Sequence, residues 1–201
     1  KEIKFTFDHL INWEVRRPEF ADAYTYASAI NEAYANDGIR KPRYHEYEMN
    51  AFKTGAYPQY YPNVNWVDEV FKDAAATNIA NMSLRGGGSK FRYFAMFNWV
   101  TDNGFIANAK ANDGYSTQNK SSKANLRTNL DIDLTPSTKM TLNLLGTLAE
   151  TNKPGDSADL WSMIYSLPAT AFPVKTENGL WGGNTTWDGT KNPVAQSQAA
   201  A

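Results

Sequence analysis

The 201-residue sequence contains no cysteine. This absence excludes a disulfide framework, thiolate metal sites and a cysteine nucleophile, and it suits either a cytosolic protein or a cell-envelope protein. Histidine is nearly absent too, because only His9 and His45 occur, and their spacing is not that of metal ligands. We therefore expect neither a metal site nor a cofactor.

The chain also lacks an excess of positive or negative charge, and it lacks long apolar runs. The net charge is −1, so the chain has no basic footprint for nucleic acid. No apolar run is as long as a transmembrane helix, so any membrane role must use strands. No signal peptide opens the chain, which begins with strand-like residues and ends in a polar stretch without a closing element. We expect a fragment of a larger protein.

The usual catalytic motifs are missing as well. The sequence has neither H-E-x-x-H nor G-x-S-x-G. The glycine-rich run at 86–90 lacks the spacing of a phosphate loop and precedes a strand, so we expect a hairpin turn. Asp131 and Asp133 share a strand face and are the pair that suits acid–base chemistry. A hydrolase using such a carboxylate pair stays open, but Asn125 and Arg127 on that face favour a solvated or lumen-lining surface. We expect no catalytic residues and no enzymatic activity.

Alternating apolar and polar residues dominate the region from 79 to 151. Successive side chains of a strand point to opposite faces, so this alternation predicts four antiparallel strands. One apolar row contains Phe91, Tyr93, Phe97 and Trp99. The most regular polar row consists of Lys123, Asn125, Arg127, Asn129, Asp131 and Asp133.

The connections between these strands alternate in length. Short turns are expected at 86–89 and 135–138, and a long polar connection at 101–118. Short turns alternating with long loops are typical of outer-membrane β-barrels. A soluble antiparallel sheet with one face on a core has the same alternation, so both interpretations stay open.

Helical periodicity is found on both sides of this region. Helices are expected over 20–34, 44–52 and 65–74, and from 156 or 157 to 167. The rest of the chain after 168 is expected to be irregular loop.

Aromatic residues make up 13% of the chain. Such an excess suits aromatic girdles at a membrane interface, sugar-stacking surfaces or a tyrosine-rich core. The candidate ligand-binding residues are Trp181 and Trp187, set among glycines and amides, and Tyr60 and Tyr61, which lie between prolines. The alternative is that these rings hold irregular loops together.

Four segments follow one another in an order that resembles a known family. They are the residues at 22–33, Tyr-Pro-Asn-Val-Asn-Trp-Val-Asp-Glu-Val at 61–70, Asn-Met-Ser-Leu-Arg-Gly-Gly at 81–87 before Phe-Arg-Tyr-Phe at 91–94, and Asn-Leu-Arg-Thr-Asn-Leu-Asp at 125–131. Together they resemble the start of the barrel in the SusC/RagA family of TonB-dependent outer-membrane transporters. Asn65 departs from the family, which more often has Asp there, and the last thirty or so residues match only loosely.

The resemblance implies a mainly β fold with helical insertions, in which antiparallel strands form part of a transmembrane β-barrel. The implied divisions are a first strand at 1–8, a helical extracellular insertion at 9–76, strands at 77–151, and a loop region with a short helix at 152–201. The plug domain would be absent.

The resemblance also implies a function in the cell outer membrane. Such a transporter imports glycans or peptides together with a SusD-like surface lipoprotein and is driven by TonB, which would bind the missing N-terminal region. Lipid would cover the apolar rows, and the six polar residues from Lys123 to Asp133 would face the lumen. The alternative is a soluble cell-envelope carbohydrate-binding module that uses its Trp and Tyr loops.

Overall fold

The computed structural model describes residues 1–107, 109, 111–112, 115–153, 157–186 and 192–198. The chain divides into two compact units. The first consists of Lys1–Glu14, Asp73–Phe105 and Gln118–Lys153, and the second of Val15–Lys72, Ile106–Thr117 and Pro154–Ala201. Each unit is described by itself.

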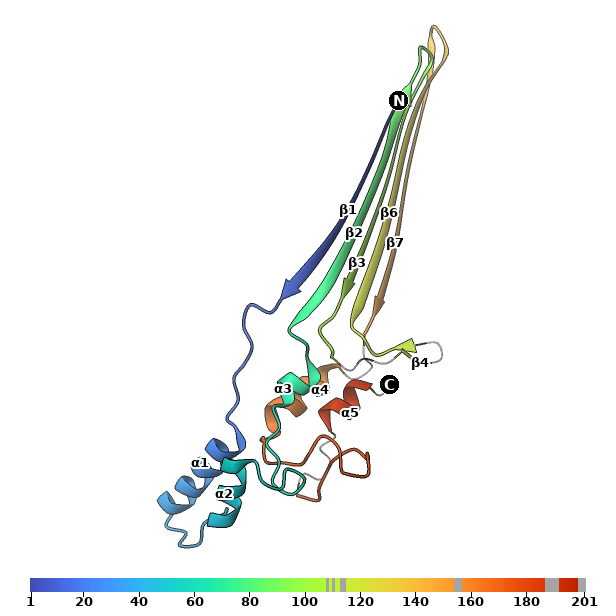
Figure 1. Ribbon diagram of the computed structural model, residues 1–201. Coiled ribbons are helices and arrows are strands. Elements are labelled where there is room, and N and C mark those ends of the chain that lie inside the picture. The colour runs from blue at the N-terminus through green and yellow to red at the C-terminus, as the bar shows by residue number, and fades with distance from the viewer. Residues whose placement is uncertain (108, 110, 113–114, 154–156, 187–191, 199–201) are drawn as a thin grey trace. The chain divides into compact units, whose positions relative to one another are not determined.

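The first unit is an antiparallel sheet of five strands in the order β1-β2-β3-β6-β7 (Figure 1). The strands are β1 (Glu2–Trp13), β2 (Ala74–Gly87), β3 (Phe91–Asn103), β6 (Lys120–Thr135) and β7 (Thr138–Asn152). Among the described residues, β1 and β7 do not pair with each other, so the sheet is open. The protein is therefore mainly β, with a few short helices.

Short turns join β2 to β3 and β6 to β7 at the same end of the sheet (Figure 1). At this end Gly86 lies opposite Tyr93 on β3. A Cβ atom on Gly86 would lie 2.5 Å from the Tyr93 hydroxyl oxygen, so only glycine leaves room for that ring. The connections to the second unit all leave from the opposite end. The predicted alternation of short turns and long connections is confirmed.

The pairing register gives the sheet one apolar and one polar face. Phe97 lies opposite both Met82 and Leu126, and Leu130 lies opposite both Tyr93 and Leu142. The six polar residues predicted to share a face do so, opposite β7 residues that include Thr141 and Thr147. The alternation in the sequence thus specifies both faces, because adjacent strands pair without a shift of register until the irregularity between Asp133 and Thr135.

The apolar face carries large exposed side chains. Phe5 is 67% exposed and Leu148 is 64% exposed, although both lie within paired strands. Other exposed apolar side chains on this face are Ile3, Phe7, Met82, Phe91, Phe97, Trp99, Leu126, Met140, Leu142 and Leu144. A sheet that exposes so much contiguous apolar surface requires a covering partner or an apolar solvent.

The second unit contains the helices. They are α1 (Ala23–Asn36), α2 (Glu46–Thr54), α3 (Trp66–Val70), α4 (Ser157–Ser166) and α5 (Pro193–Gln198), with a two-stranded ribbon of β4 (Ala111–Asn112) and β5 (Tyr115–Ser116). Asp22 and Asn65 cap α1 and α3 through hydrogen bonds to backbone N–H groups. Gly55 ends α2 with φ of 71°, a value that favours glycine. None of the described helices is long and apolar enough to cross a membrane.

Two hydrophobic clusters hold the second unit together. The larger one packs α3, α4 and α5 around Trp66, Ile164 and Phe172. The smaller one surrounds Ala23 and Phe52 between α1 and α2. Apolar residues far apart in the sequence meet in each cluster, so the helices are stabilised by packing rather than by their own propensity.

Several boundaries in the structure differ from the predicted ones, and three of these differences change an element's extent or type. β1 continues beyond Asp8 to Trp13, because each of these residues pairs with a residue of β2. The third helix ends at Val70, and Ala74 already belongs to β2. After 168 the chain is not wholly irregular, since α5 begins at Pro193 and packs its Val194 into the larger cluster.

Candidate functional site

The polar face of the sheet carries a ladder of hydrogen-bonded side chains that crosses all five strands. Thr147 Oγ1 donates to Asn125 Oδ1 at 3.0 Å, and Asn125 Nδ2 donates to Asn98 Oδ1 at 3.1 Å. Asn98 Nδ2 donates to Asn81 Oδ1 at 2.7 Å, and Asn81 Nδ2 donates to Thr6 Oγ1 at 3.2 Å. Every step joins directly opposite residues, and every donor points toward β1. We call these five residues the amide ladder.

Charged pairs lie on the same face nearer the turns. Arg85 Nε donates to Glu2 Oε2 at 2.7 Å, across the β1–β2 pair. On the same face, at the opposite edge of the sheet, Thr141 Oγ1 donates to Asp131 Oδ1 at 2.8 Å. The Lys139 ammonium lies 3.8 Å from the Asp133 carboxylate. These contacts give both predicted aspartates a neighbour on β7.

The polar face therefore presents hydrogen-bonding and charged groups of both signs to water. Asp131 and Asp133 lie beside Thr141 and Lys139, and no histidine shares this face. Among the residues that the structure describes, no three His, Cys, Asp or Glu side chains gather in a way that could hold a metal ion. The polar face is thus a hydrated surface on which several side chains bond to one another across the strands.

The two tyrosines predicted to bind ligand differ in their surroundings. Tyr60 is 77% exposed and keeps its ring in solvent. Tyr61 makes edge contacts with Tyr47 and Phe52, at centroid distances of 6.2 and 5.9 Å. Burial beside these rings raises the pKa of Tyr61. Tyr61 thus packs against the smaller cluster, and only Tyr60 offers an open ring.

Of the two tryptophans predicted to bind ligand, Trp181 lies in the part of the chain that the structure describes. Trp181 pairs with Lys175 in an isolated antiparallel β-bridge, and the Lys175 ammonium lies 4.7 Å from the centroid of the indole ring. This cation–π contact occupies one face of the indole, so a ligand ring could stack only on the other. Trp187 lies outside the described residues.

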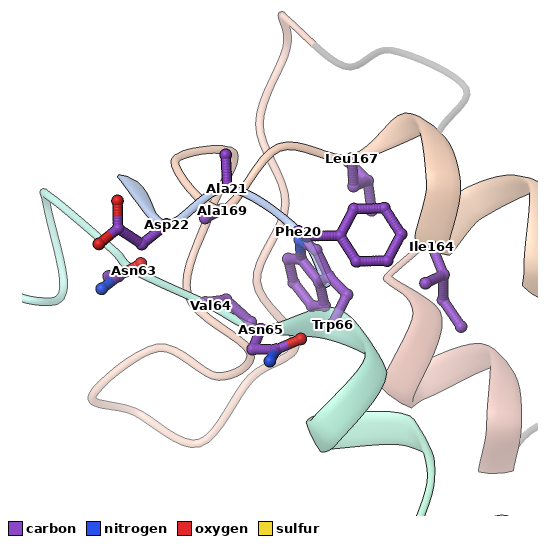
Figure 2. Close-up of a pocket in the computed structure, with 10 residues that line it drawn as sticks. All are labelled: Phe20, Ala21, Asp22, Asn63, Val64, Asn65, Trp66, Ile164, Leu167 and Ala169. Atoms are coloured by element: carbon purple, nitrogen blue, oxygen red, sulfur yellow. The ribbon is translucent and has the colours of Figure 1, made fainter. Parts of the chain in front are cut away.

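A hollow in the second unit was not predicted from the sequence (Figure 2). Its cavity volume is about 170 Å³. Its apolar lining includes Trp66, Ile164, Leu167 and Ala169, which are all buried. Phe20 closes one side and keeps 40% of its surface exposed. The hollow thus has an apolar floor beneath an exposed rim.

The polar residues of the hollow belong to its rim. Figure 2 shows Asp22 and Asn63 together at one end, with Phe20, Trp66 and Leu167 at the other. Thr25 N donates to Asp22 Oδ1 at 2.7 Å, and Ala23 N donates to Asn63 Oδ1 at 2.9 Å. Hydrogen bonds from Thr25 hold the pKa of Asp22 below its usual range, so this carboxylate is charged at neutral pH.

Part of this site has a signal in the sequence. Asp22, Asn63 and Trp66 all lie in segments that resemble the transporter family. The contribution of Ile164 and Leu167 has no local signal, because these residues reach the hollow only through tertiary packing.

Comparison with known proteins adds no assignment. No protein-family model matches the chain, and no curated protein matches it significantly.

Proposed function

We propose that the five-stranded sheet is part of the barrel of an outer-membrane TonB-dependent transporter, which imports glycans or peptides together with a SusD-like surface lipoprotein. The observation that carries the proposal is the uncovered apolar face of the sheet. Its apolar stretches run from Phe91 to Trp99 on β3, from Ala124 to Ile132 on β6 and from Met140 to Leu148 on β7. These lengths suit the about 9–11 residues that a tilted transmembrane strand needs.

The limits of the apolar stretches support a lipid environment. Beyond Trp99 and Leu148 the same face continues with a row of polar residues, in which Asn78, Thr101, Ser122 and Glu150 lie opposite one another. Trp99 lies next to this row and donates from Nε1 to Ser122 Oγ at 3.3 Å. An amphipathic ring at the edge of an apolar band is typical of a membrane interface.

The polar face suits the water-filled interior of a barrel. Lys123, Arg127 and Asp131 all lie on it, and an Arg or Lys side chain in mid-membrane lipid would cost about 2–4 kcal/mol. The amide ladder satisfies polar side chains that line this interior. In this arrangement the second unit belongs to the connections on the external side, where a surface lipoprotein and the imported ligand bind.

The proposal is tested in the native source cells with an antibody raised against this chain. We expect a protein several times larger than 201 residues in the outer-membrane fraction, with a gel mobility that changes on boiling because a folded barrel resists detergent. A soluble protein of the size of this chain would overturn the proposal. That outcome would direct attention to the carbohydrate-binding module, for which sugar-dependent quenching of tryptophan fluorescence is the appropriate assay.

A further inference from the structure

We infer that the hollow beside Asp22 binds an amine that carries an apolar group. The inference goes beyond the proposed transport function and does not depend on it, because every lining residue belongs to the second unit. The shared chemistry is an ammonium next to a hydrocarbon or aromatic group, as in a free hydrophobic amine or in the first residue of a peptide.

The apolar end of the hollow determines which part of a ligand it can hold. A cavity of about 150 Å³ holds a benzene ring, so the hollow has room for one aromatic or branched aliphatic group. Trp66 is 3% exposed and Ile164 is 1% exposed, and both belong to the larger hydrophobic cluster, so the floor of the hollow is apolar. An apolar group entering from the rim would meet Phe20 and Leu167, which lie beside each other at this end of the hollow (Figure 2).

The charge of Asp22 at the rim determines which charge the ligand carries. Asp22 is the one ionisable residue that lines the hollow, and no ion pair with it is found in the part of the chain that the structure describes. An ionised carboxylate has about four acceptor sites, more than Thr25 can occupy, so acceptor capacity remains. The α1 macrodipole offsets only about half of a unit charge. The rim therefore stays negative and favours a cation.

The side-chain amide of Asn63, next to Asp22, offers a second acceptor for the ammonium of the ligand. Asn63 Oδ1 is held beside Asp22 by the hydrogen bond from Ala23 N. The side chains of Asp22 and Asn63 thus lie at the same end of the hollow (Figure 2), and an ammonium has three donors for the acceptors there. The order of groups, with the apolar floor deep and the acceptors at the rim, sets the orientation. The ligand inserts its apolar group and leaves its ammonium at the entrance.

The test uses the complete 201-residue chain in detergent micelles, which cover the apolar face of the sheet. Titration calorimetry compares leucinamide, the peptide Leu-Gly-Gly and N-acetyl-leucinamide. We expect leucinamide to bind and the acetylated compound, which lacks the ammonium, not to bind. Equal binding of Leu-Gly-Gly indicates a site that accepts peptide amino termini, and its failure to bind indicates a site limited to free amines.

Two variants make the test specific. Asp22→Asn keeps a side chain that caps helices as well as Asp does but removes the charge, and we expect it to weaken leucinamide binding about three- to fivefold. Ala21→Trp adds bulk at the exposed rim and is expected to block binding. Circular dichroism confirms that both variants remain folded. Absence of leucinamide binding, equal binding of the acetylated compound, or an unchanged affinity in Asp22→Asn would each overturn the inference. None of these results would bear on the location of the parent protein, which the fractionation tests.

Discussion

Asn98 and Asn125 lie directly opposite each other on β3 and β6, and Asn125 Nδ2 donates to Asn98 Oδ1 at 3.1 Å. Asn98 in turn donates to Asn81 at 2.7 Å. Each residue at the centre of the amide ladder therefore both donates and accepts. This makes the central positions more sensitive to substitution than the ends.

We expect Asn98→Ala to lower the free energy of unfolding by about 1 kcal/mol, because it removes two side-chain hydrogen bonds on a half-buried position. Urea denaturation in detergent micelles, followed by tryptophan fluorescence, measures the change. Asn143→Ala is the matched control, since Asn143 shares this face but is exposed and has no side-chain hydrogen bond to a described residue. Equal effects of the two substitutions would show that the ladder contributes nothing.

The assignment of the apolar face to lipid predicts opposite results for two adjacent residues. Leu130 lies on the apolar face and Asn129 on the polar one. In the full-length protein we expect Leu130→Arg to impair insertion, because a lipid-facing Arg costs about 2–4 kcal/mol. Asn129→Arg is expected to insert normally. Surface yields measured in outer-membrane fractions check both, and equal yields would contradict the face assignment.

The cap at Asp22 predicts a dependence of α1 on pH. The pKa of Asp22 is lower in the folded chain than its ordinary value of 3.8, so the unfolded chain binds more protons. The cap therefore stabilises fully at a pH above 3.8 and is lost as the pH falls through the lower folded value. Circular dichroism between pH 6 and pH 3 should show a larger loss of helicity than in Asp22→Asn, whose amide does not titrate. At neutral pH we expect Asp22→Ala to cost about 1 kcal/mol.

Asn192 is predicted to be a sensitive position of the second unit. It is buried, and its Nδ2 donates to Val174 O at 2.9 Å and to Gly182 O at 3.2 Å. Its Oδ1 accepts from Val194 N at the start of α5. We expect Asn192→Ala to cost about 2 kcal/mol, since two carbonyl groups lose a buried donor. Thermal unfolding compared with the exposed Asn178→Ala variant measures this difference.

The strands and their faces could be predicted from the sequence, because their signal is local. Alternation from Lys123 to Leu134 specifies a strand without reference to any other segment. The local signal ends too early in β1, because His9 and Leu10 interrupt the alternation of polar and apolar residues. Only the pairing of these two residues with Asn78 and Thr77 extends the strand.

The hollow and the role of Asn192 could not be predicted, because both depend on tertiary packing. Phe20 meets Leu167 only through the packing of segments that are far apart in the chain. The surroundings of the described aromatic candidates could not be predicted for the same reason. Tyr61 packs against Phe52, Trp181 is covered on one side by Lys175, and neither contact has a local sequence signal.

The position of β1 in the sheet has a consequence for the order of folding. Hydrogen-bonded residues of β6 and β7, such as Asp131 and Thr141, are 10 positions apart, whereas Asn12 of β1 and Thr77 of β2 are 65 positions apart. Closing the longer loop costs about 1.7 kcal/mol more in chain entropy. The hairpins β2–β3 and β6–β7 are therefore expected to form early, with β1 added as the last and slowest step. Until then β2 is an edge strand whose backbone can pair with another chain, so this interval is when the protein is most prone to misassembly.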